Sequence, residues 1–260
     1  MKYLPTNAEA KHVYRTLASF FAQRSAASKS REVHSKGVTA TGTLEVLPNS
    51  FPEISMFRPG SKYHVLLRHS NGGKRIFIEI SLTFLVSEDD LAHDIRGATL
   101  RILDIDNKQD LDESIMDLLL TTGPRFMVNS ADLLLRWMMA SKKDKYDLVQ
   151  QNPAIGQVTW EVMKPATKYQ DYYYYSKVAY LLQQKTKEVG YVKFRLVPGT
   201  KAADVPSIQA TDSYAADTFV RDSSDTRAKS YLKDLYASQV DSEGVQYILQ
   251  AQFYPMQVCI

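Results

Sequence analysis

Residues 30–46 read SREVHSKGVTATGTLEV, and the sequence pattern of the chain changes within this stretch. Before it, residues 8–27 carry apolar side chains at helical spacing, which predicts a helix in an N-terminal arm of residues 1–30. After Gly37 the pattern changes to short runs of β-prone residues. His34 lies at the junction, so it is either a catalytic group beside a pocket or a polar residue beside a strand.

The rest of the sequence predicts two groups of strands around a helical insertion. The first group, residues 37–105, holds four β-prone runs, at 39–47, 62–68, 76–86 and 98–105. The insertion, residues 108–150, predicts helices at 111–120 and 131–142. The second group, residues 155–255, predicts a helix at 222–236 and strands at 157–163, 172–182, 189–196 and 245–253.

These two groups of strands predict an α+β fold. Antiparallel strands in this number could close into one barrel, which would leave no free edge and would enclose a cavity. Two separate α+β domains are the alternative. Periodicity alone leaves both arrangements open, and no tandem repeat divides the chain.

The composition is that of an ordinary globular protein, with 44% hydrophobic and 23% charged residues. The formal charge of +3 is too small to indicate nucleic-acid binding, which needs a clustered basic face. Nowhere do 18 apolar residues run together, so we expect no integral membrane segment. The single cysteine, Cys259, excludes an internal disulfide and a cysteine-based zinc site, and predicts an intracellular, cytoplasmic protein.

Two patterns that suggest other chemistries fail on physical grounds. His64 and His69 lie five residues apart on a predicted strand, so they point to opposite faces and cannot share a metal ion. Tyr173 and Lys177 have the Tyr-x-x-x-Lys spacing of short-chain dehydrogenases, but the helix and the glycine-rich turn of that chemistry are lacking. His34 remains a candidate functional residue, because the small residues that follow it would let a flat cofactor or a substrate approach the backbone.

Six short motifs occur in order along the chain. They are residues 31–37 (REVHSKG), 67–70 (LRHS), 94–97 (DIRG), 117–121 (DLLLT), 173–178 (YYYSKV) and 192–199 (VKFRLVPG). Taken in this order over residues 31–255, they resemble the catalase superfamily, and most closely the catalase-related allene oxide synthases. The first motif is similar to the Arg-Val-Val-His-Ala-Lys-Gly stretch that carries the distal histidine of catalases.

The resemblance implies a single catalase-like domain over residues 1–260, with an eight-stranded antiparallel barrel and haem b at one side. It makes His34 the distal acid–base group and Ser70 the residue that orients it. It also implies two guanidinium groups that pair with the haem propionates and two apolar side chains beside the porphyrin. These four cofactor-binding residues are Arg31, Arg68, Val33 and Phe126.

The sequence departs from the family pattern at two places. The position of the distal asparagine holds Thr121, the third catalytic candidate, whose hydroxyl lacks an amide donor and should polarise a peroxide less strongly. The proximal tyrosinate of the family comes from an Arg-x-x-x-Tyr helix after the barrel, and the sequence ends at Ile260 without one. We therefore expect the C-terminal helical region to be missing, and we identify no metal ligand.

Three functional hypotheses follow from these observations. The first is a haem protein that acts on hydroperoxides, as a fatty-acid hydroperoxide isomerase or lyase or as a weak peroxidase. The second is a haem-free barrel that binds a small, apolar organic ligand, either as a binding protein or as a cofactor-independent acid–base catalyst. The third is an inactive interaction module whose exposed apolar surface favours a homo-oligomer.

Overall fold

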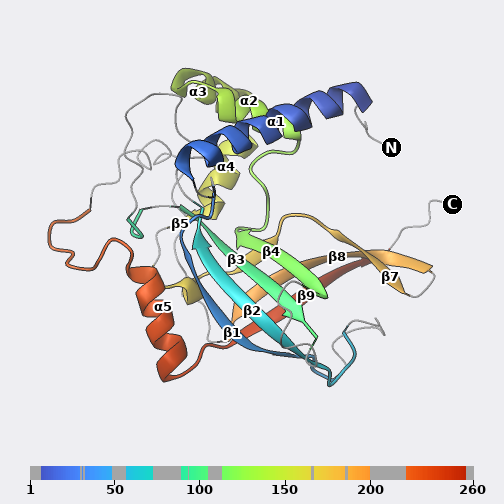
Figure 1. The fold of residues 1–260 in the computed structure, drawn as a ribbon. Helices are drawn as coiled ribbons and strands as arrows, with labels where there is room; N and C mark the ends of the chain where they lie inside the picture. Colours follow the sequence, from blue (N-terminus) through green and yellow to red (C-terminus); the bar gives the residue numbers. More distant parts are fainter. Residues whose placement is uncertain are drawn as a thin grey trace.

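The computed structural model describes residues 7–29, 31, 33–48, 57–72, 89–92, 94–104, 113–164, 167–184, 187–199 and 221–255 of the 260-residue chain. One strongly curved antiparallel sheet carries most of the fold within these residues (Figure 1). Four helices gather at one end of the sheet, and a fifth packs against the first strand. The strand expected at residues 76–86 lies outside the described residues.

In the described part of the chain, one helix precedes four strands, three helices follow them, and a fifth helix comes just before the last strand. The helices are α1 (Asn7–Ser28), α2 (Ala131–Met139), α3 (Lys142–Gln151), α4 (Pro153–Val162) and α5 (Tyr231–Ser242), with a short 3-10 helix η2 (Tyr169–Asp171). The strands are β1 (Gly37–Glu45), β2 (Lys62–Asn71), β3 (Asp94–Leu103), β4 (Met116–Thr122), β5 (Met163–Lys164), β6 (Tyr174–Ser176), β7 (Tyr180–Gln184), β8 (Lys187–Pro198) and β9 (Tyr247–Pro255).

The sheet confirms the expected α+β class, but its described strands do not close into the expected eight-stranded barrel. Its strands lie in the order β1-β2-β3-β4-β6-β8-β7, with β9 paired to the other side of β8 and β5 paired to β3. In the described part of the chain, β1 pairs only with β2 and β9 only with β8. The nine-stranded sheet therefore curls without closing, because its two terminal strands form no backbone hydrogen bonds with each other.

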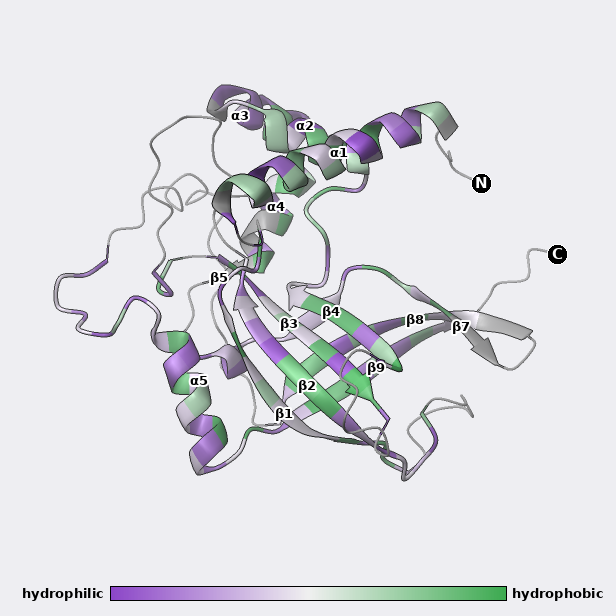
Figure 2. Cartoon of the chain, in the orientation of Figure 1, coloured by the Kyte–Doolittle hydropathy of each residue, from purple (hydrophilic) through white to green (hydrophobic). Residues whose placement is uncertain are grey.

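Buried and less buried residues alternate along residues 98–102 of β3, so the sheet has two distinct faces. Figure 2 shows hydrophobic and hydrophilic bands along β2, β3 and β4. The inner face holds the main hydrophobic core, in which Ala98, Ile102 and Leu118 are fully buried. Helix α5 packs Leu232 and Tyr236 into the same core. We call the opposite side of the sheet the outer face.

A second, smaller core, which includes Trp137, Leu148 and Ile155, holds α2, α3 and α4 together. Ser130 caps α2 by accepting a hydrogen bond from the backbone N–H of Leu133 at 3.1 Å. Ser141 and Asp144 form a capping box at the start of α3. These caps stabilise two helices of nine and ten residues, which are too short to be stable alone.

Two elements were predicted wrongly, one in the helical insertion and one in the second group of strands. The helix expected at residues 111–120 is replaced from Met116 by strand β4, in which Leu118 and Leu120 are buried while Leu119 is 66% exposed. This period-2 burial cannot be read from a run of three leucines. The expected strand at residues 157–163 is mostly helix α4, in which Val158 and Val162, four residues apart, are both buried.

Smaller differences concern element boundaries. The expected strand at residues 172–182 is divided into β6 and β7, and the helix expected from residue 222 begins at Tyr231. The helices of the insertion run on to Val162, and the expected 108–150 insertion also contains β4. Element ends are the least certain part of a prediction from sequence alone, because capping and tertiary contacts decide them.

Candidate functional site

The candidate site lies on a row of directly paired residues that crosses the outer face of the sheet. Gly37 of β1 pairs with Ser70 of β2, Ser70 with Gly97 of β3, and Gly97 with Thr121 of β4. Paired residues of antiparallel strands share a face, so these positions form one line. Two of the four are glycines, which keeps the surface beside Ser70 flat.

His34 reaches this row from the segment just before β1. Its backbone N–H donates to the carbonyl of Gly72 at 3.1 Å, and its own carbonyl accepts from Nη2 of Arg68 at 2.8 Å. Its φ angle is 53°, in the left-handed region that residues with a side chain rarely adopt. These contacts turn the imidazole toward the sheet, where Nδ1 lies 3.0 Å from Oγ of Ser70.

Gly97 forms the surface on which the imidazole lies. A Cβ atom at this position would lie 2.8 Å from Nδ1 and 2.9 Å from Cε1 of His34, and 2.7 Å from Oγ of Ser70. Contacts this short are not compatible with any side chain. The ring of His34 therefore packs directly on the backbone of β3, and only glycine allows it.

Burial and positive charge keep His34 neutral. Burial is the main cause that lowers its pKa to about 4, and the nearby guanidinium groups of Arg68 and Arg31 lower it further by repulsion. At neutral pH the imidazole therefore has a lone pair available to accept a proton. A group that accepts and returns protons in a reaction needs this property.

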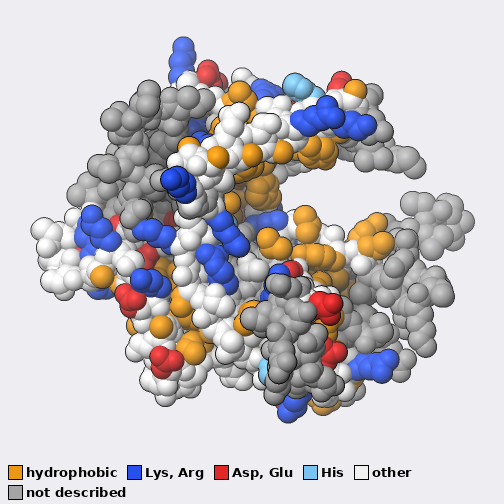
Figure 3. Space-filling view, viewed as in Figure 1, with side chains coloured by type: hydrophobic (Ala, Val, Ile, Leu, Met, Phe, Trp, Pro, Cys, Tyr) orange, Lys and Arg blue, Asp and Glu red, His pale blue; other side chains and the backbone are white. Residues whose placement is uncertain are grey.

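The two arginines form a cationic border beside His34. Arg68 is half-buried, and burial together with the charge of Arg31 lowers its pKa. Arg31 itself is exposed. Figure 3 shows basic side chains on the face between α1 and α5, and a hollow below α1 lined by hydrophobic side chains. A ligand that carries carboxylates would be attracted to this border.

The three remaining predicted site residues are Thr121, Val33 and Phe126. Thr121 is half-buried and belongs to the row through its pairing with Gly97. Val33 is half-buried next to His34, and Phe126 lies in the loop after β4 with 48% of its surface exposed. His34, Ser70 and Arg68 are joined by hydrogen bonds, and the roles assigned to all seven residues stay predictions.

The motif at residues 94–97 is a buried structural element that contains an ion pair, because Nη1 of Arg96 lies 3.9 Å from Oδ2 of Asp94. It begins β3, and Arg96 is 1% exposed. Nη2 of Arg96 donates to the carbonyls of Asp90 and Ala92 at 2.8 and 2.7 Å. A carboxylate oxygen of Asp90 in turn accepts from the backbone N–H of Leu232 at 2.7 Å, which links this turn to the start of α5.

Lys177 is a group whose position the sequence did not reveal. Its Nζ donates to the carbonyls of the two residues that follow Thr121, which are Thr122, at 2.8 Å, and Gly123. Burial and repulsion from Lys193 lower its pKa to about 7. The Tyr-x-x-x-Lys spacing drew attention to this lysine for a different chemistry, and nothing in that motif indicates its burial.

An Arg-x-x-x-Tyr spacing does occur before the last strand, at Arg227 and Tyr231. Tyr231 is 7% exposed and packs in the inner core, and the guanidinium carbon of Arg227 lies 4.5 Å from the centre of its ring. This tyrosine therefore faces the interior and not the outer face that carries His34. The described residues hold no group of three or more metal-binding side chains, and none of their helices is long and apolar enough to span a membrane.

Comparisons with known proteins agree with the geometry. No protein-family profile matches the chain. A fungal catalase superposes with a TM-score of 0.59 at 16% identity, covering 98% of this chain and 48% of the catalase. Catalase A of Saccharomyces cerevisiae gives 0.58 at 13% identity, covering 98% of this chain and 50% of that protein. The chain has the catalase fold.

The relatives found by sequence comparison are more specific than the structural matches. The chain is 26% identical over 253 residues to a linolenate 9R-lipoxygenase of Nostoc sp., which covers 95% of this chain and 31% of that protein. It is 23% identical over 233 residues to an allene oxide synthase–lipoxygenase protein of Plexaura homomalla, covering 86% of this chain and 20% of that protein. The resemblance to the catalase superfamily and its allene oxide synthase branch is confirmed, and the chain spans less than a third of these relatives' length.

Proposed function

We propose that this catalase-like chain binds haem b on its outer face and acts on fatty-acid hydroperoxides, with His34 as the acid–base group. One observation carries the proposal: the neutral imidazole of His34 is fixed by Ser70 against Gly97, beside two guanidinium groups. The names of the relatives support the substrate class, because lipoxygenases form fatty-acid hydroperoxides.

The residues on the outer face fit a flat, dianionic cofactor. Gly37 and Gly97 keep the surface beside Ser70 free of side chains. Arg68 and Arg31 supply the positive charge that propionates require. Val33 and Phe126 would supply apolar contact with the porphyrin. When bound, haem would supply an iron centre that breaks the O–O bond of a hydroperoxide.

His34 would exchange the proton of the substrate. With Nδ1 held by Ser70, Nε2 is the ring nitrogen that can take the hydroperoxide proton and return it to the departing oxygen. Ser70 is 1% exposed, so it holds the ring in one orientation away from competing water. Thr121, on the same row, would offer a hydroxyl to the peroxide in place of an amide.

Titration of the protein with haemin tests the proposal. We expect a Soret band with a one-to-one end point, a shift of this band in His34→Ala, and conversion of a fatty-acid hydroperoxide that is lost in the same variant. Lys233→Ala, at an exposed position of α5 outside the proposed site, is the control and should behave as the parent protein. A protein that takes up no haemin would overturn the proposal.

A further inference from the structure

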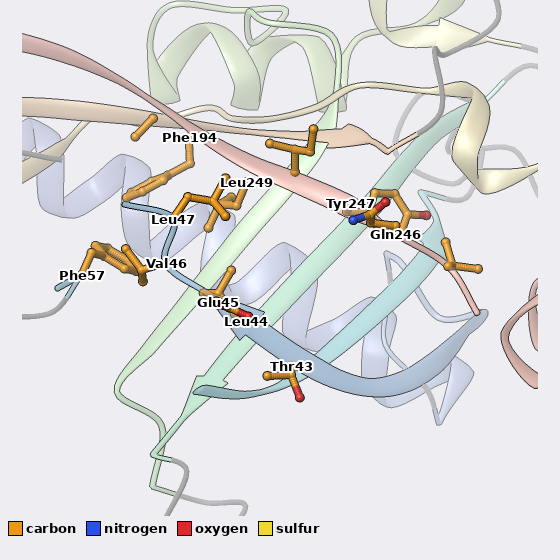
Figure 4. Close-up of a pocket in the computed structure, with 13 residues that line it drawn as sticks. Thr43, Leu44, Glu45, Val46, Leu47, Phe57, Phe194, Gln246, Tyr247 and Leu249 are labelled. Atoms are coloured by element: carbon orange, nitrogen blue, oxygen red, sulfur yellow. The ribbon is translucent and has the colours of Figure 1, made fainter. Parts of the chain in front are cut away.

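The seam between the two terminal strands of the sheet contains a pocket of about 450 Å³ (Figure 4). Residues 43–47 at the end of β1 form one wall, and residues 245–249 and Ala251, just before and at the start of β9, form the opposite wall. A pocket of this size is in the range that holds a small organic molecule. It exists because the sheet curls without closing at this seam.

The walls of the pocket come from the inner face of the sheet. Leu44 and Val46 line it on the side of β1, Leu249 on the side of β9, and Phe57 and Phe194 lie next to them (Figure 4). Val46, Phe57 and Phe194 are at most 7% exposed. The seam therefore opens onto apolar side chains of the core, which favour an apolar ligand.

One end of the pocket is polar and has almost no charge. Tyr247 lines it, and its hydroxyl lies 2.9 Å from Nε2 of the buried His69. Gln246 lines the pocket beside it. Glu45 is the acidic residue of the described lining, and Nζ of Lys62 lies 3.3 Å from its carboxylate. No arginine, lysine or histidine is among the described lining residues, and Lys62 is already paired with Glu45, so a carboxylate would find no unpaired cation here.

The pocket is distinct from the site of His34. Gly37, which lies beside that site, and Leu44 are at opposite ends of β1, and seven residues of strand span roughly 23 Å. The two sites also differ in charge, because guanidinium groups border only the site of His34.

We infer that the seam pocket binds an uncharged amphiphile with one apolar chain and one hydrogen-bonding group, for which a long-chain alcohol is the simplest example. The chain lies between Phe57, Phe194 and Leu249, and the hydroxyl group meets Tyr247 and Gln246. This site does not depend on haem, and it can be tested on the protein without added cofactor.

Displacement of an uncharged fluorescent probe, N-phenyl-1-naphthylamine, measures this binding. We expect dodecan-1-ol to displace the probe at a concentration at least tenfold lower than dodecanoate at pH 7.5. Tyr247→Phe should weaken the alcohol about 3- to 10-fold, the effect of one hydrogen bond, and should leave probe affinity unchanged. Equal affinity for alcohol and dodecanoate would overturn the assignment to an uncharged ligand.

Filling the pocket gives the second test. Leu249→Trp should reduce probe binding at least tenfold, whereas Leu119→Trp, on the outer face of β4, should have no effect. If Leu249→Trp lowers the melting temperature markedly, Ala251→Leu fills the same pocket with a smaller change. Full probe affinity in a folded filled variant, or no probe binding by the parent protein, refutes the proposal.

Discussion

Each face of β2 carries or contacts one histidine, and the two histidines have different surroundings. Ser70 points outward and holds His34, while the preceding residue, His69, points inward and is fully buried. The ring of His69 stacks on Tyr169 at 4.7 Å between centroids and lies 4.8 Å from Tyr236. Burial lowers the pKa of His69 to about 3, so both histidines are neutral at pH 7.

What separates the two histidines is their surroundings and not their charge. His34 lies on a glycine, beside a serine and two arginines, and can meet a ligand. His69 is enclosed by tyrosine rings and is hydrogen-bonded to Tyr247. A neutral, buried histidine is therefore not by itself a sign of catalysis, and the first should serve chemistry while the second serves stability.

The largest expected effect is on the outer face. His34→Ala should lower the rate of hydroperoxide conversion by about 10²- to 10⁴-fold, because it removes the proton-exchanging group. The free energy of unfolding should change by no more than about 1 kcal/mol. Steady-state kinetics with haemin-loaded protein and urea denaturation measure the two quantities. A loss of less than threefold in rate would contradict the role of His34.

The converse substitution tests the inner face. His69→Ala leaves a cavity among the tyrosines and removes the partner of Tyr247, so it should lower the free energy of unfolding by about 2–4 kcal/mol. The rate per folded, haem-loaded molecule should stay within twofold of the parent. His34→Ala is the matched control in the same denaturation series. The comparison fails if His69→Ala abolishes turnover in protein that is still folded.

Substitution of Gly97, on which the imidazole lies, tests how strongly turnover depends on the position of the His34 ring. Gly97→Ala would push its methyl group into His34 and Ser70, and a displacement of this kind should lower the rate on the order of 10²-fold. Gly42→Ala is the control, since its new Cβ meets only Val65 at 3.6 Å. If both alanine variants keep the parent rate, the position of the ring on Gly97 does not matter for turnover.

The smallest effect is expected from pH. Because the pKa of His34 is lowered to about 4, the imidazole stays neutral as pH falls from 8 to 5. The rate should therefore be flat over this range and should fall by half only near pH 4. Rates measured between pH 4 and 8, with a separate check that the protein remains folded, give the profile. A midpoint near 6.5 would show that His34 is solvated and not held as described.

The resemblance of short local motifs to the catalase superfamily pointed to His34, Ser70 and Arg68 as site residues. Strand pairing brings these three residues together, and their roles stay predictions. The alternation within β4 was hidden by three consecutive leucines, and β-branched residues concealed α4. The open seam lies between β1 and β9, near opposite ends of the sequence, so no local pattern contains it.

Because the backbone of His34 is left-handed, the residue type that favours stability at this position differs from the one that activity requires. A residue with a side chain is roughly 1–2 kcal/mol less favourable in this conformation, and glycine would avoid that cost. Variants selected for thermal stability alone should therefore accumulate glycine at position 34, while variants selected for turnover should keep histidine. The ordinary route to a more robust protein would in this case remove its acid–base group.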